Sequence, residues 1–249
     1  MTESILVRIA KERFEEVDSQ TVHFTEIEEI DNYLNDLENY PHAFVLACMM
    51  DRQIKAEKAW KIPFVVSDKF GAKDIIDLSK IDLNEYVKLF ESEKLHRFNK
   101  QMAEIFYEAV LRICNVYKND ASKIWSDKPS SASVVYRFLE FKGSGIKIST
   151  MAANILARQF KIPFSDYYSI DISPDVHIKR VMKRFGYVPE NADNDKIIYK
   201  ARELNPEFPG IIDFSCWRIG RNWCRPNNSD CKNCIVRSEC KWVKSKNNE

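Results

Sequence analysis

The sequence predicts an all-α fold, and three observations carry this prediction. The 249-residue chain contains only six glycines, and apolar residues recur at helical spacing over long stretches. Outside short pieces, no run of residues alternates between apolar and polar side chains. With 45% hydrophobic and 30% charged residues, the composition is that of an ordinary globular protein, and the length admits one domain or two.

The clearest helix is expected over residues 98–117. Similar spacing predicts one helix each over Phe44–Trp60, Leu83–Leu95 and Val134–Leu139. The piece Phe64-Val-Val-Ser alternates, so strands are expected to be minor at most. The apolar stripe of the first helix consists of Phe98, Met102, Ile105, Phe106, Ala109, Val110, Ile113, Cys114 and Tyr117.

Charge and hydropathy predict a protein of the cell interior. The N-terminal stretch meets charged residues too early for a signal peptide, and the longest apolar run, residues 43–50, is shorter than the ~20 residues of a membrane helix. We therefore expect a cytoplasmic protein without a membrane partner, associated with the nucleoid if the source is prokaryotic. The net charge of +1 gives no overall attraction for a polyanion, so any such attraction is local.

The segment 138–156 predicts a helix, a glycine hairpin and a second helix. Gly143 and Gly145 allow backbone angles that other residues avoid, and they let another chain approach closely. The amide N–H groups that begin the second helix suit a phosphate. Taken alone, this Gly-x-Gly pattern is more typical of a plain helical hairpin than of a phosphate site.

A second helix start follows at residues 173–176. Ser173, Pro174 and Asp175 precede an apolar stripe, so Asp175 is expected as a first-turn acid that complements the helix dipole. Asp171 lies four residues upstream and is a second acid to consider for any role given to Asp175.

Four cysteines near the C-terminus have the spacing Cys-x6-Cys-x2-Cys-x5-Cys. Structural zinc sites use two cysteine pairs, whereas this stretch has one pair flanked by two single cysteines. Four thiolates in a compact loop suit a 4Fe-4S cluster, while zinc and unrelated cysteines stay open as alternatives. The set is Cys224, Cys231, Cys234 and Cys240; the other cysteines, Cys48, Cys114 and Cys216, are expected in the core.

These three motifs together resemble the helix-hairpin-helix DNA glycosylases of the endonuclease III type. Gly143, Gly145 and Lys147 match the family's hairpin and its lysine nucleophile. Asp175 and the following His177, Arg180 and Val181 match the motif of its catalytic aspartate, and the cysteine spacing matches its cluster loop. The stretch Cys48–Gln53 loosely resembles the helix end whose glutamine fills the gap left by a flipped base.

The resemblance implies a two-lobed fold and a function. Residues 35–161 would form a helical barrel lobe containing the hairpin, and residues 1–34 plus 162–249 would form the iron–sulfur cluster lobe. The implied activity is that of a monomeric DNA glycosylase of base excision repair with abasic-site lyase activity. Its partner would be double-stranded DNA containing a damaged base, an oxidised pyrimidine by default, or an abasic site.

The resemblance also assigns roles to residues. Lys147 would be the nucleophile that forms a Schiff base, and Asp175 would be the catalytic carboxylate. Gly143, Ser144, Gly145 and Gln53 would contact DNA. The four clustered cysteines would hold a 4Fe-4S cofactor with a structural role.

Some residues depart from the family pattern. Ser144 replaces an apolar residue, Ile148 and Ser149 stand where the family prefers Thr-Ala, and Ser173-Pro174 replaces a small residue and valine. The excised lesion therefore stays open. So do three alternatives: a monofunctional glycosylase in which Lys147 only contacts phosphate, a non-catalytic iron–sulfur DNA-binding protein, and a zinc-stabilised binding module.

Overall fold

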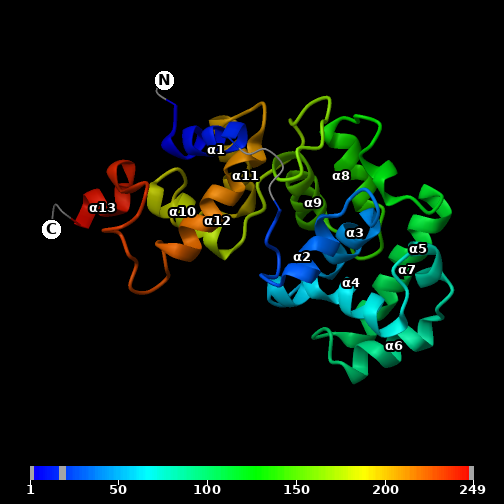
Figure 1. Ribbon diagram of the computed structural model, residues 1–249. Coiled ribbons are helices and arrows are strands. Elements are labelled where there is room, and N and C mark those ends of the chain that lie inside the picture. The colour runs from blue at the N-terminus through cyan, green and yellow to red at the C-terminus, as the bar shows by residue number, and fades with distance from the viewer. Residues whose placement is uncertain (1–2, 17–20, 247–249) are drawn as a thin grey trace. The chain divides into compact units, whose positions relative to one another are not determined.

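A computed structural model describes residues 3–16 and 21–246, and these residues form thirteen α-helices and three short 3-10 helices, with no strand among them (Figure 1). The all-α prediction is therefore confirmed. The contacts divide the chain into two compact units. Unit 1 is Met1–Asp18, Ser130–Ala132 and Ala153–Glu249, and unit 2 is Ser19–Pro129 and Ser133–Ala152.

Unit 2 is built around two central helices, α3 and α7. All ten residues of α3 are buried, as expected for a helix that is apolar on nearly every face. Pro41 has no backbone N–H, and at the first position of a helix that N–H would have no intrahelical acceptor. The long helix α7 packs its predicted stripe against α3, α5 and α6. The helices of this unit are α2 (Glu28–Asn35), α3 (Pro41–Met50), α4 (Ala56–Phe70), α5 (Ile75–Ser79), α6 (Leu83–Ser92), α7 (Asn99–Tyr117) and the 3-10 turn η1 (Ala121–Ile124).

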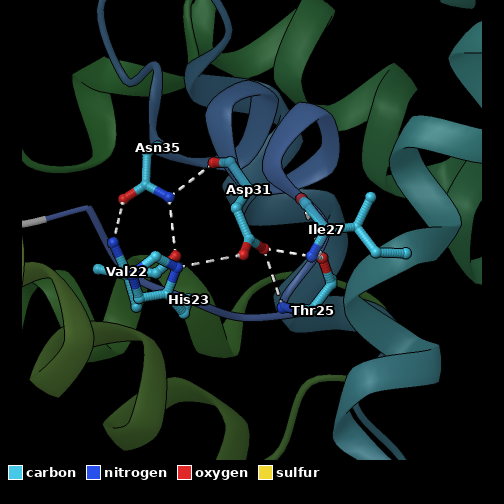
Figure 2. Close-up of polar contacts among 6 residues, drawn as sticks. All are labelled: Val22, His23, Thr25, Ile27, Asp31 and Asn35. Carbon is cyan, nitrogen blue, oxygen red and sulfur yellow. Dashed lines mark hydrogen bonds and ion pairs between the residues drawn. The ribbon is translucent and has the colours of Figure 1, made fainter.

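Side chains of α2 hold the extended segment 21–27, as Figure 2 shows. The Asn35 amide donates to the Val22 carbonyl at 2.9 Å, and its oxygen accepts from the Val22 N–H at 2.7 Å. Asp31 Oδ1 accepts two bonds of 2.8 Å, from the Thr25 N–H and from the Thr25 hydroxyl. These bonds satisfy the backbone of a segment that has no helix of its own. Residues 21–34 belong to unit 2, and the division into a barrel lobe and a cluster lobe stays a prediction.

Unit 1 contains the C-terminal helices. Helix α10 packs on α12 and on α13, and α1 packs on α12 and η2. The elements are α1 (Ile5–Glu16), α10 (Val176–Phe185), α11 (Asn194–Leu204), η2 (Pro209–Ile212), α12 (Asp213–Asn222), η3 (Arg237–Glu239) and α13 (Lys241–Lys246). Helices α8 (Ser131–Leu139) and α9 (Ile146–Arg158) each contribute residues to both units.

Two local predictions were wrong. The stretch 44–60 is not one helix, because α3 ends at Met50 and α4 begins at Ala56. Residues 64–67 lie inside α4, in agreement with the expectation that strands are minor at most. Cys48 and Cys216 are buried as expected, but Cys114 is only half-buried. None of the described helices is long and apolar enough to cross a membrane.

Candidate functional site

The hairpin between α8 and α9 has the predicted glycine turn. Gly143 has a φ of +82°, and a Cβ built on it would lie 2.8 Å from Ile105 Cδ1 and 3.2 Å from Arg52 Nη1. Both the backbone angle and the space therefore require glycine at this position. Gly145 differs, because a Cβ there would meet nothing within 4 Å.

Two of the departures from the family pattern contact each other. The hydroxyl oxygens of Ser144 and Ser149 lie 3.0 Å apart, and the fully buried Ser149 hydroxyl also donates to the Gly145 carbonyl at 3.2 Å. The Ser144 N–H donates to the Phe141 carbonyl at 3.0 Å. The hairpin is thus held by hydroxyl groups on its inner side, where the family has an apolar side chain.

Lys147 is the second residue of α9, and it is exposed. Its charge acts on Asp51, the residue that ends α3. Burial raises the pKa of the Asp51 carboxyl, the positive charge of Lys147 opposes this rise, and the negative charge of Glu57 adds to it. The charge of Lys147 therefore interacts with the partly desolvated Asp51 carboxylate of the same unit.

The turn after α3 lies against the hairpin. Arg52 Nη1 donates to the Gly143 carbonyl at 3.3 Å, and the turn itself is closed by a bond of 2.8 Å from the Arg52 N–H to the Met50 carbonyl. Gln53 follows with a φ of +53° and an exposed side chain. The residue expected to fill a gap in DNA thus lies in the loop that Arg52 ties to the hairpin.

Asp175 is the N-cap of α10, one position before the predicted first turn. Its Oδ1 accepts from the His177 N–H at 2.8 Å and from the Ile178 N–H at 2.7 Å. In the part of the chain that the structure describes, no hydrogen-bond donor is found for Oδ2 of this half-buried carboxylate. One oxygen therefore holds the helix start, and the other stays available to a ligand.

Asp171, the rival acid, is fully engaged. Both of its oxygens accept from Arg202: Oδ1 from Nε at 2.8 Å and Oδ2 from Nη2 at 2.7 Å. The carboxylate is buried, while the arginine side chain is 41% exposed. This bidentate pair gives Asp171 a structural role and leaves Asp175 as the better candidate for chemistry.

Helix α12 braces the start of α10. Asp213 Oδ2 accepts from the Ser173 N–H at 2.6 Å. At the other end of α12, a Cβ added to Gly220 would lie 2.6 Å from His177 Cβ. The backbone of α12 at Gly220 therefore packs directly against the His177 side chain of α10. Arg180 Nη2 donates to the Gly220 carbonyl at 2.9 Å and contacts His177 Nδ1 at 3.0 Å. His177 therefore takes part in ordering this helix start.

Two arginines of α10 hold the cysteine loop. Arg180 Nε donates to the Cys224 carbonyl at 2.6 Å. Arg184 Nη1 donates to the Arg225 carbonyl and to the Ser229 hydroxyl, both at 2.7 Å, and it lies 3.5 Å from Cys224 Sγ. Both guanidinium groups are therefore used inside unit 1 to hold this loop.

The four clustered cysteines line one pocket. Their neighbours there are mainly apolar: Val181, Phe185, Ile219, Trp223, Val236 and Val243. Burial raises the pKa of the Cys234 and Cys240 thiols, and the neighbouring thiols add to the rise. Four thiolates in such surroundings need a positively charged group among them, so the donor set fits an iron–sulfur core. Within residues 3–16 and 21–246, no group of three or more His, Cys, Asp or Glu side chains has the arrangement needed to hold a metal ion.

Sequence reasoning missed the bracing residues. Asp213 acts on Ser173 from a distant part of the chain, and no local pattern signals such a bond. Arg180 and Arg184 did carry a signal, because arginines four residues apart lie on one side of a helix. Without the fold, however, the sequence does not show whether the helix face with Arg180 and Arg184 lies against solvent or against the cysteine loop.

The fold resembles those of solved DNA glycosylases. A non-covalent endonuclease III–DNA complex matches with a TM-score of 0.64 and 15% identity over 100% of both chains. A trapped endonuclease III–DNA covalent intermediate, an estranged-adenine complex, matches with a TM-score of 0.60 and 15% identity over 92% of this chain and 99% of that chain. A thermostable thymine-DNA glycosylase matches with a TM-score of 0.62 and 16% identity over 96% of this chain and 97% of that chain.

At these identities the likeness concerns the fold alone. The chain has an all-α fold of the endonuclease III type over its full length, so this part of the prediction is confirmed. No protein-family model matches the sequence, and no curated protein matches it.

Proposed function

We propose that this chain is a DNA glycosylase of base excision repair with an associated abasic-site lyase activity. One observation carries the proposal: an exposed lysine, Lys147, directly follows the Gly143–Gly145 hairpin in a chain with the fold of DNA glycosylases. The substrate is double-stranded DNA containing a damaged base or an abasic site.

The hairpin is proposed to bind a phosphate. Its backbone N–H groups between Gly143 and Lys147 lie at the start of α9, where the helix dipole favours an anion. Such contacts fix the position of the duplex without reading its sequence. Gln53, in the loop tied to the hairpin, fills the space left by the flipped nucleotide, and exposed cations of the cysteine loop such as Arg225 and Lys232 contact a second phosphate.

Lys147 is proposed as the nucleophile. Its neutral amine forms a bond to C1′ of the sugar, while the glycosidic C1′–N bond breaks and the base leaves with the bonding electrons. Loss of a proton from the lysine nitrogen and opening of the sugar ring give a Schiff base, from which β-elimination cleaves the strand.

Asp175 is proposed as the catalytic carboxylate. Positive charge builds on the sugar as the glycosidic bond breaks, and a fixed negative charge nearby lowers the energy of that state. The N-cap bonds to Oδ1 hold the carboxylate in one orientation, so Oδ2 can face the reacting sugar. Fixing a charge in advance is what makes such stabilisation effective.

Cys224, Cys231, Cys234 and Cys240 are proposed to hold a 4Fe-4S cluster. The cluster supplies a structural cross-link in unit 1 and takes no part in cleaving the glycosidic bond. Iron and sulfide analysis of the purified protein, with its visible absorbance, tests this assignment. Four irons and a broad visible band are expected, whereas a colourless protein with one zinc would replace the cluster with a zinc site.

Borohydride trapping on a labelled duplex with one abasic site tests the function. We expect the native protein to form a covalent adduct and Lys147→Ala to form none. Lys142→Ala is the matched control, because Lys142 is an exposed lysine of the same hairpin that pairs with Glu108 at 3.2 Å. It should form the adduct at nearly the native rate.

The other outcomes separate the alternatives. Base release from a lesion-containing duplex without a trapped adduct would make the protein a monofunctional glycosylase. Binding of a duplex with an abasic-site analogue, without turnover of any lesion, would make it a non-catalytic DNA-binding protein. An adduct that persists in Lys147→Ala would move the nucleophile to another residue.

A further inference from the structure

The segment that leads into Asp175 is fixed by a bond from another helix. Asp213, the first residue of α12, accepts the Ser173 N–H on Oδ2 at 2.6 Å. Ser173 is buried, so its N–H has lost water and depends on a protein acceptor. This short bond to a carboxylate is of the strong, charge-assisted kind.

Little conformational freedom lies between this anchor and Asp175. Pro174 has its φ fixed near −65° by the ring, and a residue before proline, here Ser173, is confined to extended conformations. On the far side, the N-cap bonds tie Asp175 to the His177 and Ile178 amides. The position of the Ser173 N–H therefore largely determines where the Asp175 carboxylate lies.

Asp213 has a cationic partner in unit 1. Arg158, on α9, lies in unit 1 with its guanidinium 4.4 Å from the centroid of the Phe214 ring. Burial lowers the pKa of Arg158 to about 10, and the negative charge of Asp213 opposes that fall. Arg158 Nε is buried and has no hydrogen-bond partner among the described residues.

We propose that Asp213 is a positioning residue for Asp175, acting through the Ser173 N–H and the rigid Ser-Pro step. The inference rests on the proposed function, because it concerns the group that stabilises the reacting sugar. It also gives a reason for the Ser173-Pro174 departure from the family pattern: the proline transmits the anchor at Ser173 to the carboxylate.

The test is a double-mutant cycle on the full-length, metal-loaded protein. The rate of base release is measured under single-turnover conditions on a duplex with one oxidised pyrimidine, together with the Kd for the same duplex with a reduced abasic site. The variants are Asp213→Ala, Asp213→Asn, Asp175→Asn and the double variant with Asp213→Ala. Asp193→Ala is the control, because Asp193 caps α11 through the Lys196 N–H at 2.9 Å and lies on the surface.

Asp213→Ala should slow base release by up to about 10²-fold, the scale expected for a misplaced catalytic group, with Kd nearly unchanged. Asp213→Asn retains an acceptor for the Ser173 N–H and should recover most of the rate. In the Asp175→Asn background, Asp213→Ala should add no further loss, because its effect passes through that carboxylate. Asp193→Ala should leave the rate unchanged.

Two results would overturn the inference alone. A native-like rate in well-folded Asp213→Ala would show that the anchor does not matter to the reaction. A full additional loss in the double variant would show that Asp213 acts independently of Asp175. If the native protein forms no adduct and releases no base, the proposed function fails first, and the positioning role fails with it.

Discussion

The two helix starts that carry the candidate chemical groups are built differently. At α9, glycine geometry and the Ser144–Ser149 hydroxyl pair shape the backbone, and the candidate group Lys147 has an exposed side chain. At α10, the candidate group itself holds the turn, because Asp175 Oδ1 accepts two backbone N–H bonds. Structure and chemistry are thus separate at the first site and combined in one side chain at the second.

This difference decides how variants should be interpreted. A change of Lys147 removes a functional group from a turn that other residues hold. A change of Asp175 alters the helix cap and the proposed charge together, and an N-cap contributes about 1 kcal/mol. The two contributions of Asp175 can be separated only by replacements that keep one of them.

The largest expected effect comes from Asp175→Asn. Asparagine is as good an N-cap as aspartate, so the free energy of unfolding should change by less than about 0.5 kcal/mol. Without the negative charge, base release should fall by about 10²-fold or more. Urea unfolding and single-turnover kinetics measure the two effects, and Asp175→Ala should add the loss of the cap. Equal losses of stability in the Asn and Ala variants would contradict the capping role.

Asp171→Asn should give the opposite pattern. Removing the charge from the bidentate pair with Arg202 should cost about 2 kcal/mol of stability, with no change in the rate of base release per folded molecule. The control is Asp127→Asn, which breaks a similar bidentate pair with Arg137 on a carboxylate that is 59% exposed. That exposed pair should contribute less than about 1 kcal/mol, as chemical denaturation can show.

The two hairpin glycines should respond unequally to alanine. Gly143→Ala should destabilise the protein by about 1–2 kcal/mol, because alanine is strained at positive φ and its Cβ would press on Ile105. Gly145→Ala should leave thermal unfolding nearly unchanged, since its Cβ meets no atom. A fall in DNA affinity for Gly145→Ala would then report close approach of the phosphate. Equal destabilisation by both changes would contradict the hairpin geometry.

The smallest expected effect is a gain of stability in Asp51→Asn. Because burial raises the folded-state pKa of Asp51, the folded protein retains this proton more strongly than the unfolded chain does. The free-energy cost of burying the ionised Asp51 carboxylate is absent at low pH. It develops as the pH rises from the pKa of the unfolded chain through the higher pKa of the folded protein. Urea midpoints should therefore show a larger gain for Asp51→Asn at pH 7 than at pH 4, and none for exposed Asp77→Asn.

Local patterns predicted the elements that are stabilised locally. The stripe of residues 98–117 became α7, because one face of a long helix must be buried. The hairpin followed from its glycines. The start of α10 followed from its Ser-Pro-Asp sequence, with the cap displaced by one residue. In each case the residues that determine the structure are neighbours in the sequence.

The remaining features depend on contacts between distant residues. Asn35 and Asp31 hold the segment 21–27, and Asp213 holds Ser173, through bonds to backbone groups that no periodicity marks. The break between α3 and α4 was missed because residues 51–55, Asp-Arg-Gln-Ile-Lys, contain neither glycine nor proline to mark it. For Asp175 and Lys147, the sequence predicted the positions, but only the structure shows what each side chain contacts.

The contact between Gly220 and His177 has a consequence for genetics. Any side chain at position 220 would press on the backbone and Cβ of His177, two residues from Asp175. A missense change there would displace the first turn of α10, and Asp175 with it, without replacing any of the proposed catalytic or cysteine residues. In a deep mutational scan, position 220 should therefore be as intolerant as the catalytic positions, although glycine itself brings no functional group to the reaction.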